Sequence, residues 1–448
     1  MNATAALSHR DEPVPIGDGF SPALMMDVEL TEPLPSVSYD GRRRRVWVLG
    51  RLYGEPVGSC LLRLNAGGLA PGQLAALLWP QLREPVAARF AVAGLPKPGT
   101  LTGQGLTADP AQWPFLLRRR EVLAEAPLIS VVVCTRDRAD RLEVCLRHLD
   151  RQEYPRFEVV VVDNAPTSDA VRVLVEARRG LVNYHYRYVA ERRGGLSWAR
   201  NAGIADASGD VIAFLDDDEE PDGNWLAGLA AGFARGDDIG CVTGMILPTR
   251  LDTPIQEWFE WSGGHSMGRG FSPAVFSRHD PQSPLFPLPP FGAGGNMAFR
   301  REALARIGGF DVAMGAGTPA RASEDTLAFT LVLLAGYRIA YEPAALVRHD
   351  HYAGPAELRR QLHGYSVGLG AYYTALLRHR PGVLPALLRL LPAAVGYLRG
   401  ASEKTAAVPH DLPAQFRRSQ RLPLLTGPGA YLRSVRRQAR VAASEARQ

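Results

Sequence analysis

The feature that most constrains the fold is a run of five apolar residues followed directly by five acidic ones. Residues 211–215 read Val-Ile-Ala-Phe-Leu, and residues 216–220 read Asp-Asp-Asp-Glu-Glu. A short apolar run bounded by turn residues predicts a strand buried on both faces of a parallel sheet. Ligands of open α/β sheets bind at the carboxyl ends of such strands. A solvated acidic loop is the alternative, but the position directly after a buried strand favours a binding site.

The acidic residues at this strand end point to a particular ligand chemistry. Adjacent carboxylates repel one another unless a cation or hydrogen-bond donors offset their charge. Oxygen ligands suit a hard divalent ion such as Mg²⁺ or Mn²⁺, and such an ion suits a phosphate-bearing substrate. The sequence therefore predicts a divalent-metal site for a phosphorylated ligand after residue 215.

Strands and helices alternate through this part of the chain. The predicted strands are 128–134, 157–162, 184–189 and 211–215, and the predicted helices between them are 141–149, 171–177 and a segment ending near 205. This alternation is typical of a doubly wound, mostly parallel α/β sheet with right-handed crossovers. Polar residues follow three of the strands, namely Thr135, Arg136 and Asp137, then Asp163 and Asn164, and finally Asp216, Asp217 and Asp218. Neighbouring parallel strands would bring these ends together.

The flanking segments differ in composition from this central region. We expect five parts: 1–40, poorly ordered; 41–110, a small α+β module of unknown role with two strands and a helix; 111–127, a linker; 128–352, the main domain; and 353–448, a helical, basic extension. A loop as long as 262–290 inside a compact domain is usually functional.

Charge and cysteine usage restrict the partners and the location. The formal net charge is +5, and only the C-terminal tail concentrates basic residues, so we expect no nucleic-acid partner. The four cysteines are scattered, and neither a signal peptide nor an apolar run of about 18 residues is evident. We expect a cytoplasmic protein. The arginine-rich extension either contacts anionic lipid headgroups at the inner face of the membrane or is a solvated tail.

Six motifs in a fixed order resemble the inverting family-2 glycosyltransferases with a GT-A fold. The motifs lie at 131–138, 161–164, 194–203, 214–218, 294–297 and 323–325, and the resemblance covers roughly residues 128–352. It implies a GT-A type sheet and the transfer of a sugar from a nucleotide-diphosphate sugar to an acceptor hydroxyl with inversion. It also implies a Mn²⁺ or Mg²⁺ cofactor. The acceptor stays open: a glycan, a lipid-linked molecule, a peptide or a small molecule.

The resemblance also assigns residues to the donor. It places the metal on Asp216 and Asp218, with His349, or else His351, as an additional metal or phosphate contact. The residues implied to bind the donor nucleotide are Thr135, Arg136, Asp137, Asp163, Arg200, Asp216 and Asp217. Asp163 would accept from the base, and Arg200 would face the phosphates. Without these motifs, Arg200 would be read as a surface residue of an amphipathic helix.

The acceptor side rests on a second acidic pair. An inverting displacement needs one general base, and the resemblance places it at Glu324 or Asp325, of which we favour Asp325. The local alternative is that Ser323 caps a helix whose first turn is acidic. The acceptor pocket is expected to include Trp258, Trp261, Gly295 and Asn296, although tryptophans in such spacing are more often core residues.

Two other functions fit a similar sheet. A nucleotidyltransferase would carry a glycine-rich, basic loop after the first strand, and residues 134–138 do not form one. A catalytically idle sugar- or lipid-binding scaffold is disfavoured by the intact acidic motifs. The Gln-x-x-Arg-Trp motif of processive synthases is absent, since residues 361–365 read Gln-Leu-His-Gly-Tyr. We therefore expect the addition of one or a few sugars.

Overall fold

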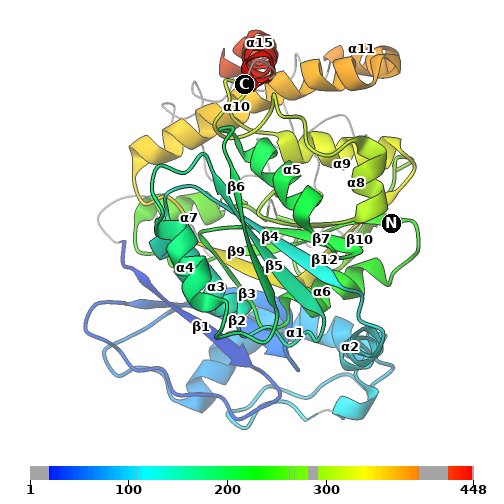
Figure 1. The fold of residues 1–448 in the computed structure, drawn as a ribbon. Helices are drawn as coiled ribbons and strands as arrows, with labels where there is room; N and C mark the ends of the chain where they lie inside the picture. The colour runs from blue at the N-terminus through cyan, green and yellow to red at the C-terminus, as the bar shows by residue number, and fades with distance from the viewer. Residues whose placement is uncertain are drawn as a thin grey trace.

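The computed structural model describes residues 20–107, 109–261, 263–266, 268–280, 291–392 and 422–445. A small N-terminal sheet has the order β1-β2-β3, made of β1 (Ala23–Glu29), β2 (Arg45–Leu52) and β3 (Glu55–Arg63). Helix α1 (Pro71–Val92) covers one face of it with buried Leu74, Leu78 and Leu82. The other face packs against the main sheet, where Trp47 and Leu49 join a buried apolar cluster. Figure 1 shows this module in blue at the bottom of the molecule.

Part of the N-terminal segment is more ordered than its composition indicated. We expected residues 1–40 to be poorly ordered, and this is wrong for residues 23–29, which pair in parallel with β2. The strand was missed because the sequence around it is rich in proline and acidic residues, yet its Ala23 and Val28 are buried. Of the rest of that segment, residues 1–19 lie outside the described residues.

The segment 111–127 is also not the linker that its prolines suggested. The short helix η1 (Pro110–Gln112) and helix α2 (Pro114–Ala124) occupy most of it. Proline is compatible with the first turn of a helix because the amide it lacks has no partner there. Trp113 is buried in the core of the N-terminal module, and Val122 packs into the core of the main domain.

The main sheet is α/β and mostly parallel, as predicted. Its order is β10-β12-β9-β11-β7-β4-β5-β6, with β8 paired to β12 outside this path. Its strands are β4 (Ile129–Thr135), β5 (Phe157–Asn164), β6 (His185–Glu191), β7 (Val211–Asp216), β8 (Glu219–Pro221), β9 (Ile239–Pro248), β10 (Ala274–Phe276), β11 (Asn296–Arg300) and β12 (Arg338–His349). The pairs β7/β4, β4/β5, β5/β6 and β9/β12 are parallel, whereas β11 runs antiparallel between β7 and β9.

Helices cover both faces of this sheet, which explains its continuous apolar strands. The helices are α3 (Ala139–Leu149), α4 (Ala170–Arg178), α5 (Leu196–Asp206), α6 (Trp225–Phe233), α7 (Pro254–Trp261), α8 (Arg301–Ile307) and α9 (Glu324–Leu334). Val131 and Val133 of β4 face a core built with α3, α4 and α6. Val132 between them faces a second core built with α5, α8 and α9.

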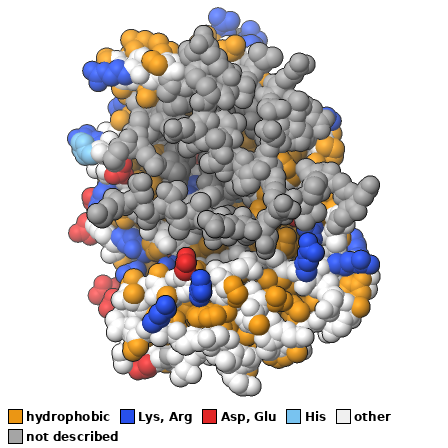
Figure 2. Space-filling model, turned by 180° about the vertical axis from the view of Figure 1, so that it is seen from behind, with side chains coloured by type: hydrophobic (Ala, Val, Ile, Leu, Met, Phe, Trp, Pro, Cys, Tyr) orange, Lys and Arg blue, Asp and Glu red, His pale blue; other side chains and the backbone are white. Residues whose placement is uncertain are grey.

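The C-terminal extension is helical where it is described. It contains α10 (Pro355–His379), η2 (Pro381–Val383), α11 (Leu384–Arg389), η3 (Leu422–Thr426) and α15 (Gly427–Glu445). Helix α15 contacts the main domain, where Trp198 Nε1 donates a hydrogen bond to Gln438 Oε1 at 2.8 Å. Leu384 and Leu388 of α11 are exposed. Figure 2 shows hydrophobic and basic side chains together at the upper edge of the molecule. Among the described residues, each helix is too short or too polar to cross a bilayer.

Candidate functional site

The three polar strand ends lie side by side, as the sequence predicted. In the register of the sheet, Cys134 of β4 pairs with Asp216 of β7, and Thr135 of β4 pairs with Asp163 of β5. Because β7, β4 and β5 are parallel neighbours, their carboxyl ends form one edge. This edge gathers the acidic residues of the 216–218 motif with Thr135 and Asp163.

The Asp217 side chain is buried and held by hydrogen bonds within the protein. Its side chain is 6% exposed, and each of its oxygens accepts a hydrogen bond. Thr135 Oγ1 donates to Oδ2 at 2.6 Å, and Arg138 Nη1 donates to Oδ1 at 2.9 Å. These contacts engage both oxygens of Asp217, and they tie β4 and the start of α3 to the acidic motif.

Asp218 is more accessible and faces three cationic or titratable groups. Arg138 Nη1 lies 3.1 Å and Arg141 Nη1 3.7 Å from its Oδ2, while His349 Nε2 lies 3.6 Å from its Oδ1. The arginine side chains are about half exposed, at 51% and 48%. Exposed ion pairs of this kind contribute little stability and can rearrange when a ligand binds. Arg141 was not singled out from the sequence, although its position in the first turn of α3 is a usable signal.

Asp216 lies at the centre of a crowded acidic group. Burial raises the pKa of its carboxyl to about 7, with Asp218 and Asp217 adding to the rise and Arg200 opposing it. Nevertheless 39% of its side-chain surface is accessible, so the group is surrounded by protein atoms yet can be reached. An accessible carboxylate that repels its neighbours is suited to a cation, and its oxygens are the donors that Mn²⁺ and Mg²⁺ prefer.

Glu219 is a buried carboxyl group that binds the backbone of Asp216. It is 1% exposed, and its Oε2 accepts from the backbone amide of Asp216 at 3.1 Å. Burial raises the pKa of Glu219 well above its ordinary value. A Cβ on Gly295 would lie 2.1 Å from Glu219 Oε1, so glycine is needed there for the carboxyl group to fit. Gly295 therefore makes room for Glu219, and its expected place in an acceptor pocket stays a prediction.

At the β5 end of this edge, Asp163 has one carboxylate oxygen without a hydrogen-bond partner. The residue is buried, Tyr188 Oη donates to its Oδ2 at 3.1 Å, and its Oδ1 has no hydrogen-bond partner. Burial raises the pKa of this carboxyl. Asp137 next to it has a left-handed backbone with φ +54° and accepts from the Thr167 amide, whereas Arg136 is exposed. An unpaired carboxylate oxygen inside the protein fits an N–H donor of a ligand.

Arg200 is a fully enclosed guanidinium that joins the two acidic motifs. It is 2% exposed; its Nη1 donates to Glu324 Oε1 at 2.7 Å, and its Nη2 lies 3.7 Å from Asp216 Oδ1. Although burial alone would lower it, Glu324 and Asp216 hold the pKa of Arg200 above its usual value. The expected surface alternative for Arg200 is thereby excluded.

Asp325 lies beside this ion pair without joining it. A Cβ on Gly294 would be 3.0 Å from Asp325 Oδ2 and 3.1 Å from Arg200 Nη2, so a glycine is what lets these groups approach. Asp325 Oδ1 accepts from the Thr326 amide at 2.6 Å. Ser323 occupies the N-cap position but has φ +68°, and its side chain makes no capping hydrogen bond. The Ser323 cap that local reasoning suggested does not form.

Of the other residues expected in the acceptor pocket, Asn296 and Trp258 are buried, and the role of Trp261 stays a prediction. Asn296 is fully buried, accepts from Trp225 Nε1 and donates to the carbonyls of Met245 and Ala345. It therefore ties β11 to its neighbours. Trp258 is 5% exposed and packs in a cluster with Leu358 and Leu362. Trp261 is partly buried, and its Nε1 donates to Glu257 within the same helix.

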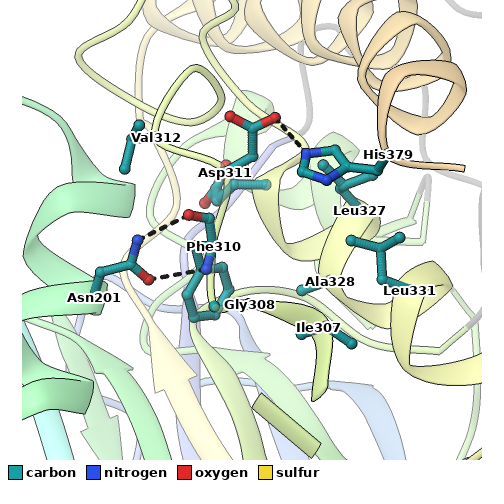
Figure 3. A pocket seen from close by; sticks show the side chains of 12 residues that line it. Asn201, Ile307, Gly308, Phe310, Asp311, Val312, Leu327, Ala328, Leu331 and His379 are labelled. Carbon is teal, nitrogen blue, oxygen red and sulfur yellow. Dashed lines mark hydrogen bonds and ion pairs between the residues drawn. The ribbon is translucent and has the colours of Figure 1, made fainter. Parts of the chain in front are cut away.

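A cavity of about 300 Å³ lies next to Glu324. It lies between α5, α8, α9 and the end of α10, and its lining includes Asn201, Phe310 and Glu324. Figure 3 shows Asn201 bonded in both directions to the Phe310 backbone and Asp311 bonded to His379. The cavity is separate from the strand ends that gather the acidic motif.

Comparison with known proteins finds relatives of the central segment. Residues 130–308 match the model of the family described as Glycosyl transferase family 2. The succinoglycan biosynthesis protein ExoM of Rhizobium meliloti is 30% identical over 223 residues, which are 49% of this chain and 65% of that protein. The glucosyl-dolichyl phosphate glucuronosyltransferase of Haloferax volcanii is 25% identical over 228 residues, which are 49% of this chain and 68% of that protein. The chain thus spans about two thirds of these relatives.

Among solved structures, the mannosyltransferase PcManGT from Pyrobaculum calidifontis, in complex with GDP-Man and Mn²⁺, aligns with a TM-score of 0.45. It is 21% identical, and the alignment covers 68% of this chain and 87% of that one.

Proposed function

We propose that this chain, whose residues 130–308 form a glycosyl transferase family 2 domain, moves a sugar from a nucleotide-diphosphate donor to an acceptor hydroxyl with inversion. The carrying observation is the position of Arg200, which lies between the Asp216 carboxylate and the Glu324–Asp325 pair. Two acidic groups with different surroundings at one site suit two different tasks: one for the leaving group and one for the incoming hydroxyl.

The donor half of the site is assigned to the strand ends. Asp163, with its unpaired Oδ1, accepts an imide N–H from the nucleotide base. Asp216 and Asp218 provide carboxylate oxygens for Mn²⁺ or Mg²⁺, and this donor set fits such an ion. When bound, the ion would act as a Lewis acid toward the diphosphate. Arg200 holds a fixed positive charge beside Asp216.

The acceptor half is assigned to Asp325. Its carboxylate takes the proton of the acceptor hydroxyl as that oxygen bonds to the anomeric carbon. The bond from this carbon to the diphosphate breaks at the same time, and its electron pair leaves with the diphosphate. Glu324 is occupied by Arg200, which leaves Asp325 as the available base. A positioned general base contributes roughly 10²–10⁴-fold to rate.

A donor screen tests the proposal directly. The full chain is heated with UDP-, GDP- and dTDP-sugars, each with and without Mn²⁺. One donor should raise the melting temperature only when Mn²⁺ is present, because a ligand at 100 times its Kd adds about 2.7 kcal/mol to stability. Release of free nucleotide diphosphate with a suitable acceptor, and the anomeric configuration of the product, then report transfer. If none of the nucleotide sugars binds in Mn²⁺ or Mg²⁺, the proposed function is wrong.

A further inference from the structure

One arginine of the loop after α7 has a guanidinium group without an acidic partner. Arg269 is half-buried, and its Nε and Nη1 are buried without a hydrogen-bond partner. Its Nη2 donates to the His265 carbonyl at 2.9 Å, and its guanidinium lies over the Tyr341 ring at 5.6 Å. Within the described part of the chain, no acidic side chain forms an ion pair with it.

The missing partner is costly because the guanidinium stays charged. Burial lowers the pKa of Arg269 to about 10, with Tyr341 and Asp325 opposing the fall. At neutral pH the side chain is therefore a cation. Buried polar atoms without a partner are rare in native proteins, and a buried charge without one costs still more free energy. Such a group indicates an anionic ligand that supplies the missing acceptors.

The buried arginines elsewhere in the described chain differ from Arg269 in this respect. Arg45 pairs with Glu257 at 2.6 Å, and Arg200 pairs with Glu324 at 2.7 Å. Arg51, the third arginine in this class, likewise has carboxylate partners. The fold therefore neutralises its other buried guanidinium groups with its own acids.

The loop holds Arg269 in a defined place. Gly268 and Gly270 flank it with φ +68° and +73°, so the chain turns on both sides of it. Ser266 Oγ donates to a β9 carbonyl at 2.6 Å, which ties the loop to that strand. Tyr341 Oη donates to the Gly270 carbonyl at 2.9 Å, which ties the loop to β12. A ligand would therefore meet a guanidinium whose position is already set, and this preorganisation favours binding.

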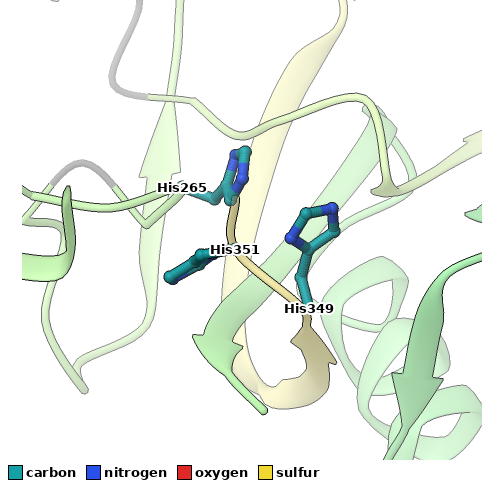
Figure 4. A group of neighbouring side chains, drawn as sticks. All are labelled: His265, His349 and His351. Carbon is teal, nitrogen blue, oxygen red and sulfur yellow. The ribbon is translucent and has the colours of Figure 1, made fainter. Parts of the chain in front are cut away.

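This loop lies on the side of the site that is assigned to the acceptor. Figure 4 shows His265 of the loop next to His349 and His351 at the end of β12. In the sheet, β9 and β11 separate β12 from β7, β4 and β5, whose ends form the donor half. Asp325, the proposed base, is the carboxylate whose charge acts on Arg269. An anion at Arg269 would thus belong to the molecule that brings the hydroxyl.

We propose that Arg269 binds an anionic group, a phosphate or a carboxylate, of the acceptor. The unpaired N–H groups on Nε and Nη1 donate to its oxygens, and a guanidinium matches the geometry of both kinds of anion. This inference rests on the proposed transfer to an acceptor hydroxyl, and it narrows the acceptor to molecules that carry a negative charge. Arg269 is then a residue that determines specificity, while Asp325 remains the base.

Anion binding by the full chain tests this proposal without a known acceptor. Glucose 6-phosphate, glucuronate and neutral glucose are titrated into the protein and followed by calorimetry. We expect the wild type to bind at least one acidic sugar about tenfold or more tightly than glucose. Arg269→Gln should weaken binding of that sugar roughly 10–100-fold, as expected when a hydrogen bond to a charged group is lost. The comparison of phosphate with carboxylate shows which anion binds.

Two control variants locate the anion. Arg300→Gln is matched to Arg269→Gln, because Arg300 is also half-buried, donates to a backbone carbonyl and lies over an aromatic ring, at 5.2 Å. Arg138→Gln alters the acidic edge, where a phosphate could also bind. Both controls should keep the wild-type affinity for the acidic sugar. Loss of binding in either control, unchanged binding in Arg269→Gln, or no preference for acidic sugars in the wild type would each overturn the proposal.

Stability separates a binding residue from a structural one. Because Arg269 is a charge without an acidic partner, Arg269→Gln should melt at or above the temperature of Arg300→Gln in anion-free buffer. A clearly lower melting temperature, or failure to fold, would show that Arg269 is structural and overturn the proposal.

The donor screen keeps the two proposals separable. If no nucleotide sugar binds but Arg269→Gln loses the acidic sugar, the proposed transfer is wrong and anion binding at Arg269 stands. If a nucleotide sugar binds in Mn²⁺ and anion binding does not depend on Arg269, only the inference about the acceptor is wrong.

Discussion

Arg200 Nη1 donates to Glu324 Oε1 at 2.7 Å and so fastens helix α5 to the first turn of α9. Both side chains are enclosed, with 2% and 8% exposure. Breaking a buried pair by removing one partner leaves an uncompensated charge. This relationship separates Glu324, which the fold uses, from Asp325, which it leaves available.

Glu324→Ala should therefore destabilise the protein strongly. The unpaired guanidinium of Arg200 would cost about 3–5 kcal/mol of unfolding free energy, to be measured by urea denaturation. Glu302→Ala is the matched control, because Glu302 also lies in the first turn of a helix but is exposed. Equal stability of the two variants would contradict the structural role of Glu324.

Asp325→Asn, unlike Glu324→Ala, should lose activity and keep its stability. Donor affinity and melting temperature should stay near those of the wild type, while kcat falls roughly 10²–10⁴-fold because the amide cannot take the acceptor proton. Steady-state kinetics and donor titration separate the two effects. If the variant transferred sugar at the wild-type rate, Asp325 would not be the general base.

Asp217 and Asp218 should differ although they are adjacent. Asp218→Asn should remove the Mn²⁺ dependence of donor binding, which calorimetry would report. Asp217→Asn should mainly cost stability, on the order of 1–3 kcal/mol, because Asp217 is bonded to Thr135 and Arg138. Loss of Mn²⁺-dependent binding in Asp217→Asn alone would reverse the assignment.

Gly295→Ala should destabilise the protein by displacing Glu219 beneath the 216–218 motif. The added methyl would lie 2.1 Å from Glu219 Oε1, so Glu219 and the Asp216 amide that it accepts from must move. Overpacking of this kind costs about 1–3 kcal/mol. Gly180→Ala, at an exposed turn with no atom within 4 Å, should be nearly neutral in the same denaturation experiment.

Asp311 should give acid sensitivity to the docking of the C-terminal helices. Burial opposes the effect, but hydrogen bonds from His379, the Ala313 amide and Tyr431 hold the pKa of Asp311 below its ordinary 3.8. A lowered folded pKa adds stability that is present above 3.8 and is lost as the pH falls through the folded value. The stability difference between wild type and Asp311→Asn should therefore be largest at neutral pH and shrink in acid. A constant difference would refute this linkage.

The predicted contact of the C-terminal extension with anionic lipid concerns the arginine-rich face of α15. Arg433, Arg436 and Arg440 are exposed, whereas Tyr431, Ser434 and Gln438 are buried against the main domain. Contact with anionic lipid thus stays a prediction. Of the other basic positions in this tail, Arg417, Arg418 and Arg421 lie outside the described residues.

Much of the main domain was predictable because local pattern and global fold agree there. The strands at 129–135, 157–164 and 211–216 are apolar throughout since helices cover both faces of the sheet. Prediction was weaker where a few residues form an element against the local composition, as in β1 and α2. Their stability comes from tertiary packing, which composition does not record.

The sequence by itself determined the sheet, the convergence of its polar strand ends and the acidic residues available for chemistry. The reason is that hydrophobic periodicity and strand-end position are properties of the chain. Only the tertiary structure decided which carboxylates are occupied: Asp217 by Thr135 and Arg138, and Glu324 by Arg200. It also moved Asn296 and Trp258 into the core and brought His265 to His349 and His351. Such pairings depend on distances between residues far apart in the chain, and no local pattern encodes them.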